Sequence, residues 1–102
     1  MALLEWSAQA RIDVDAIYDF IARQDRPLTA DRAVQGLAEA CPKYAEAFSA
    51  GSSIGTRRPT LGKDYRVFSH KRWVVVFRPA DGAIEVMRVV DGSRDYSRLF
   101  RE

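Results

Sequence analysis

The stretch RWVVVFRPADGAIEVMRVVDG, residues 72–92, decides the expected fold. It contains two apolar runs, 73–77 and 84–90, and between them lies Pro-Ala-Asp-Gly, whose Asp-Gly pair is favoured in tight hairpin turns. The pattern predicts antiparallel strands at 72–79 and 84–90. A further short strand is expected at 65–69, joined to the hairpin by a turn at His70-Lys71, so the second half of the chain reads as a meander.

The first half is expected to form a short strand at 3–6 and a helical hairpin at 8–48. Ser7 is a good N-cap for a helix over 8–23, in which Ala10, Val14, Ile17 and Ile21 recur at helical spacing. The charged residues of that helix should fall mostly on other faces: Arg11, Asp13, Asp15 and Asp19. Thr29 is the expected cap of the second helix, and its apolar stripe keeps register through Pro42, which favours a kink over a stop.

This order of elements predicts one α+β domain over residues 1–102, with the helical hairpin on one face of a small, curved, mainly antiparallel sheet. Residues 73–77 do not alternate between apolar and polar, so both faces of their strand are apolar. Two helices can cover one face. The other is expected to be covered by a partner or by the chain's own ends, which makes Trp73, Val75 and Phe77 candidate partner contacts.

The charge is unevenly distributed along the chain. The net charge is +2, but residues 1–50 carry five Lys/Arg against eight Asp/Glu, and residues 51–102 carry eleven against six. The basic second half should attract an acidic partner. The candidate basic contacts for such a partner are Arg58, Arg66, Arg78, Arg94 and Arg98.

Several classes of function are disfavoured by the sequence. No segment resembles a signal peptide or a membrane span, which favours the cytoplasm. Cys41 and His70 are single in the chain, so neither a disulfide, a metal site nor a cofactor site is expected. Cys41 is interpreted as a core residue and His70 as an exposed turn residue. The carboxylates are scattered, and no catalytic residue is predicted.

Arg88 is expected to be structural. It should share a strand face with Ile84, Val86 and Val90, and a guanidinium in an apolar row needs an acceptor. Asp91, Asp95 or a partner's acid could serve, and Asp95 is the structural ion-pair candidate. Arg94 follows the Asp-Gly turn and is expected to be exposed.

The segments that carry the strongest family signal are Gly55–Pro59, Leu61-Gly62, Tyr65-Arg66, Trp73–Arg78 and Arg88–Asp95. Together with the opening strand and helix, they resemble the ParE branch of the ParE/RelE toxins, and the resemblance covers nearly the whole chain. Where the family often has His before the last glycine, this chain has Asp91. The resemblance implies a plasmid-stabilisation toxin, a ParD-like antitoxin in a hetero-oligomer, and growth arrest through DNA gyrase, without membrane attachment or sequence-specific nucleic-acid binding.

Two alternatives remain open at this point. A RelE-like ribosome-dependent ribonuclease would need an arginine where this chain has Val74, a tyrosine at Phe100 and a lysine near Phe68. Arg66 and Arg94 remain, which is a thin set for acid–base chemistry. The other alternative is a non-toxic relic that only binds its antitoxin.

Overall fold

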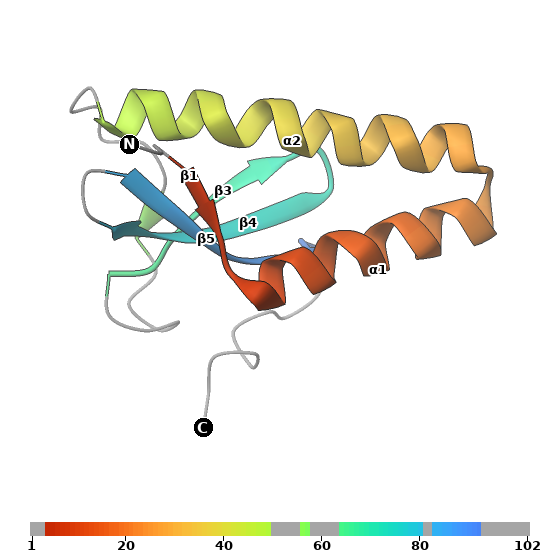
Figure 1. Ribbon diagram of the computed structural model, residues 1–102, viewed down its shortest axis with the longest axis horizontal. Coiled ribbons are helices and arrows are strands. Elements are labelled where there is room, and N and C mark those ends of the chain that lie inside the picture. Colours follow the sequence, from red (N-terminus) through yellow and green to blue (C-terminus); the bar gives the residue numbers. More distant parts are fainter. Residues whose placement is uncertain (1–3, 50–55, 58–63, 81–82, 93–102) are drawn as a thin grey trace.

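The computed structural model describes residues 4–49, 56–57, 64–80 and 83–92. Two helices and five strands follow one another in the order β1 (Leu4–Trp6), α1 (Ala8–Gln24), α2 (Pro27–Ser49), β2 (Thr56–Arg57), β3 (Arg66–His70), β4 (Trp73–Ala80) and β5 (Ala83–Asp91). In Figure 1 the two helices lie alongside each other and cover one face of the sheet.

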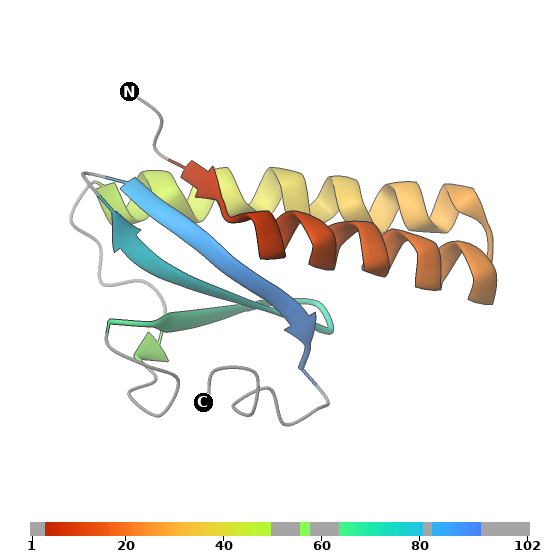
Figure 2. The same cartoon turned by 60° about the horizontal axis from the view of Figure 1, so that its bottom comes forward.

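The strands form one sheet in the order β1-β5-β4-β3-β2. β1 runs parallel to β5, and the other three neighbouring pairs are antiparallel. Figure 2 shows the long β5 and β4 crossing beneath the helical hairpin. The predicted α+β architecture is confirmed. The two-residue strand β2 was not predicted, because a strand this short carries no periodic pattern.

Both helices begin and end close to the predicted positions. Ser7 caps α1, and its hydroxyl accepts a hydrogen bond from the Ala10 N–H at 3.0 Å. α2 begins at Pro27, because proline is favoured at the first position of a helix. The predicted cap at Thr29 is therefore wrong, since Thr29 lies inside the helix. The Thr29 hydroxyl instead donates to Asp25 Oδ2 at 3.0 Å. The helix continues through Pro42 to Ser49.

The main core lies between the sheet and the helices. Trp73, Val75 and Phe77 of β4 face the helices and are at most 6% exposed. From α2, Cys41 is fully buried, as predicted, and the Tyr44 ring stacks on Phe68 at 3.7 Å between centroids. The predicted role of Trp73, Val75 and Phe77 as partner contacts is therefore wrong, since a partner cannot reach them in the folded chain.

The opposite face of the sheet has its own small core. Val67, Val74 and Val76 are at most 7% exposed there, with Tyr65 and Val90 packed beside them. These valines are buried in the single chain, so no partner is needed to cover them. Cover from within the chain was one of the two expectations for this face, the other being cover by a partner.

A bulge in β5 changes which side chains share a face. Val76 is opposite Arg88, but Phe77 is opposite Val86, so Met87 is the extra residue. Ile84 and Val86 therefore face the helices together with Val89, whereas Arg88 and Val90 point the other way. The prediction that Arg88 shares a face with Ile84 and Val86 is wrong for this reason.

Candidate functional site

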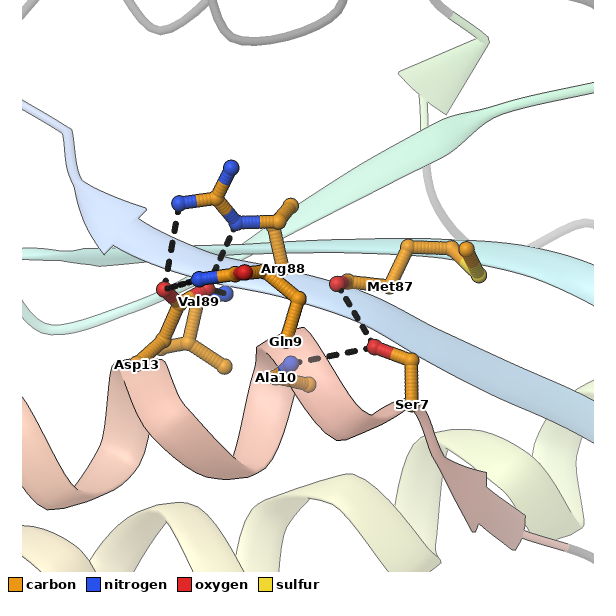
Figure 3. Close-up of polar contacts among 7 residues, drawn as sticks. All are labelled: Ser7, Gln9, Ala10, Asp13, Met87, Arg88 and Val89. Carbon is orange, nitrogen blue, oxygen red and sulfur yellow. Dashed lines mark hydrogen bonds and ion pairs between the residues drawn. The ribbon is translucent and has the colours of Figure 1, made fainter.

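The N-terminal turns of α1 take the place of a missing strand along β5. β1 pairs with β5 only from Ile84 to Val86. Beyond that point the Ser7 N–H donates to the Val86 carbonyl at 2.9 Å, and the Ser7 hydroxyl donates to the Met87 carbonyl at 2.9 Å. Nearly two helical turns after Ser7, Asp13 Oδ2 accepts a hydrogen bond from the Val89 N–H at 2.9 Å, as Figure 3 shows. Polar side chains of a helix thus satisfy a strand edge that would otherwise be open.

Asp13 is also the partner of Arg88. The Arg88 Nε donates to Asp13 Oδ2 at 2.8 Å and its Nη2 to Oδ1 at 3.1 Å, a bidentate pair (Figure 3). Gln9 adds a hydrogen bond to Oδ1 at 3.2 Å. Asp13 is 9% exposed and the Arg88 side chain 21%. Four donors therefore converge on one nearly buried carboxylate, which fixes α1 against β5.

Of the two acids expected beside Arg88, Asp91 pairs with Arg72 at 2.6 Å, and Asp95 lies outside the described residues. A signal for Asp13 was present in the sequence, because it falls between Ala10 and Ile17 at helical spacing and so on the buried side of α1. Its charge led to the wrong assignment to an outer face.

The turn between β3 and β4 exposes two adjacent basic residues. His70 pairs with Trp73 across the hairpin, which leaves Lys71 and Arg72 as a two-residue turn. Lys71 has a φ of 56°, a left-handed conformation that lysine rarely adopts. The Arg72 guanidinium lies 4.8 Å from the Trp73 ring centroid and 6.0 Å from that of Phe20 on α1, while its side chain stays 55% exposed.

Gly92 joins the end of β5 to this turn. Its N–H donates to the Arg72 carbonyl at 2.8 Å. A Cβ at this position would lie 2.9 Å from Val74 Cγ2 and 3.1 Å from the Arg72 carbonyl oxygen. The Asp-Gly pair therefore combines the ion pair to Arg72 with a close backbone approach that excludes larger residues.

A hollow lies on each side of the basic turn. One is lined by Ser69, Lys71, Arg72, Val74, Asp91 and Gly92. The other lies against α2 and is lined by Gly36, Glu39, Ala40, Lys43, Tyr44, His70 and Lys71. His70 was expected to be exposed, but its ring is half-buried and its Nε2 lies 3.0 Å from the position of a Cβ on Gly36.

The predicted basic contacts have different environments. Arg66 is half-buried and lies opposite Phe77, so it belongs to the side of the sheet that the helices cover. Arg78 is exposed, and its Nε and Nη2 lie 3.0 and 2.9 Å from Glu85 Oε1. The remaining predicted contacts lie outside the described residues: Arg58, Arg94 and Arg98.

Among the described residues, no three His, Cys, Asp or Glu side chains gather in a way that could hold a metal ion. Burial raises the pKa of the Cys41 thiol to about 12, so Cys41 is not a nucleophile at neutral pH. No helix in the described part of the chain is long and apolar enough to cross a membrane.

Comparisons with known proteins agree with this fold. Residues 4–96 match the family model described as ParE toxin of type II toxin-antitoxin system, parDE. A search of curated protein sequences finds no match. Among solved structures, a chain of the chromosomal ParDE TA system from P. aeruginosa is 26% identical, with a TM-score of 0.74 over 89% of this chain and 96% of that one. This chain therefore belongs to the ParE toxin family of type II toxin–antitoxin systems.

Proposed function

We propose that this ParE-family chain stops growth by binding and inhibiting DNA gyrase, and that a ParD-like antitoxin neutralises it by forming a hetero-oligomer with it. The observation that carries the proposal is the family match over residues 4–96. Gyrase acts on DNA in the cytoplasm, so the proposed site of action is cytoplasmic. The same family membership makes plasmid or chromosome stabilisation the proposed biological role.

The arrangement of side chains favours binding over RNA cleavage. Val74 stands where the ribonuclease branch places an arginine, and it is 7% exposed within a cluster of valines. His70, the single histidine of the chain, packs against α2 at Gly36. Acid–base cleavage needs ionisable groups that converge on the scissile phosphate, and these residues do not supply them.

Expression of the chain alone under an inducible promoter tests the proposal. We expect growth arrest, loss of supercoiling activity when purified gyrase is mixed with the chain, and intact mRNA in ribosome extracts. A matched control is Val75→Asp, which puts a carboxylate into a fully buried core position and should abolish both effects by unfolding the chain. Codon-specific mRNA cleavage with unimpaired gyrase would replace the proposal with the ribonuclease alternative.

The antitoxin is tested with the polypeptide encoded by the reading frame next to this one. We expect its co-expression to restore growth and the two chains to co-purify. A folded chain that causes no arrest but still binds this polypeptide would favour the non-toxic relic.

A further inference from the structure

Helix α1 carries an exposed apolar stripe. Ile12 is 58% exposed and Phe20 48%, and the exposed Ala16 lies midway between them. A spacing of four residues keeps all three on one side of a helix. Apolar residues scattered singly over a surface are ordinary, whereas apolar residues that form a contiguous patch mark an interaction site.

The stripe ends at the basic turn. The Arg72 guanidinium lies 6.0 Å from the centre of the Phe20 ring, and Lys71 is its exposed neighbour. Arg72 has five N–H donors, and the ion pair with Asp91 engages the guanidinium through Nη2. The rest of the fork can therefore receive a second carboxylate.

The backbone of Lys71 gives an independent reason to regard this turn as a contact. Of the two turn residues, only Lys71 has a positive φ, at 56°, as in type II′ turns, where glycine is preferred at that position. A lysine there is less stable than glycine would be in the folded conformation. A side chain kept at a strained position is explained if the side chain has a binding role.

We infer that Ile12, Ala16, Phe20, Lys71 and Arg72 form one docking surface, here called the α1–turn surface, for an amphipathic acidic segment of the antitoxin. Apolar residues of that segment would pack on the stripe, and its carboxylates would pair with Lys71 and Arg72. The inference rests on the proposed antitoxin and adds where it binds.

Charge complementarity favours this occupant over a second copy of the chain. The five residues include two cations and no carboxylate, so a symmetric contact between two copies through this same surface would bring the two basic turns together. Nucleic acid is not the favoured occupant either, because the apolar stripe offers no charge to a row of phosphates.

Calorimetric titration of the purified chain with the antitoxin from the neighbouring reading frame tests the surface. Phe20→Ala is expected to weaken binding about 10- to 100-fold, as for an anchor residue in an interface. Ala38→Asp, an exposed position on α2, is the matched control and should leave affinity within about 3-fold.

Lys71→Gly separates a binding role from a structural one. It removes a charge and relieves the strained backbone, so we expect weaker binding with a shallower salt dependence, together with an unchanged or higher Tm. A purely structural lysine cannot give that combination. Equal affinity of the parent, Phe20→Ala and Lys71→Gly would overturn the surface while leaving the antitoxin proposal intact.

Two further results would also overturn the inference. Loss of a homodimer in Phe20→Ala, with antitoxin affinity unchanged, would assign the stripe to self-association. Failure of the parent chain to bind the antitoxin at all would remove the proposed antitoxin together with the surface.

Discussion

Removing the Asp13 carboxylate should destabilise the fold more than removing its arginine partner. Asp13→Ala leaves the Arg88 guanidinium and the Val89 N–H without their acceptor at once. Breaking a buried ion pair costs about 3–5 kcal/mol, and the Arg88 side chain, 21% exposed, can recover part of this by turning to water. A buried N–H without an acceptor adds about 1–3 kcal/mol. We expect a net loss of about 3 kcal/mol.

Arg88→Ala removes less, because Asp13 still accepts hydrogen bonds from Val89 and Gln9. We expect a loss of about 1–2 kcal/mol, in the range of single charged hydrogen bonds. Asp19→Ala changes an exposed carboxylate of the same helix and should stay within about 0.5 kcal/mol.

Urea unfolding followed by tryptophan fluorescence, from the buried Trp73 and the partly buried Trp6, measures all three variants. With an m-value of about 1–3 kcal/mol/M, the Asp13→Ala midpoint should fall by about 1–3 M. A larger fall of the midpoint in Arg88→Ala than in Asp13→Ala, or equal midpoints of Asp13→Ala and Asp19→Ala, would refute this role of the Asp13 carboxylate.

Three other outcomes follow from the geometry. Gly92→Ala should lower stability by about 1–3 kcal/mol in thermal unfolding, because its Cβ would meet Val74 and the Arg72 backbone. Gly36→Ala should be close to neutral, because alanine has the higher helix propensity and the His70 side chain can move away from the new Cβ. Burial raises the pKa of the Cys41 thiol from 9.0 to about 12. The stability that the buried neutral thiol contributes is therefore complete below pH 9 and lost between pH 9 and 12. Cys41→Ala should flatten the curve of unfolding free energy against pH in this range. Arg78→Ala should change the unfolding midpoint little, since its pair with Glu85 is largely exposed and worth about 0–1 kcal/mol.

Local patterns were sufficient to predict most of the fold. The helical stripe and the Ser7 cap each specify a short segment through its own backbone chemistry, and both have the predicted structure. The predicted Asp81-Gly82 turn lies outside the described residues, and the strands before and after it are close to their predicted positions. The continuous run 73–77 predicted a strand that is apolar on both faces, and Val74 and Val76 are indeed buried on one face and Trp73, Val75 and Phe77 on the other.

The candidate site was harder to predict because it depends on register. One extra residue at Met87 reverses the side to which Arg88 points, and nothing in the sequence around Met87 marks a bulge. The partner of Arg88 then comes from a segment 75 residues away. Local spacing indicates that Asp13 is on the buried side of α1, but only the assembled sheet shows which strand edge it meets.

The contact between Asp13 and β5 also determines where the exposed stripe lies. Phe20 follows Asp13 by seven residues, or about two helical turns, so the two side chains leave α1 in nearly the same direction. Because Asp13 is bound to the edge of β5, Phe20 must lie beside the end of that sheet, where Arg72 is 6.0 Å from its ring. A rotation of α1 that released Asp13 would separate Phe20 from the basic turn. The four hydrogen bonds on one carboxylate therefore stabilise the fold and align the apolar stripe with Lys71 and Arg72.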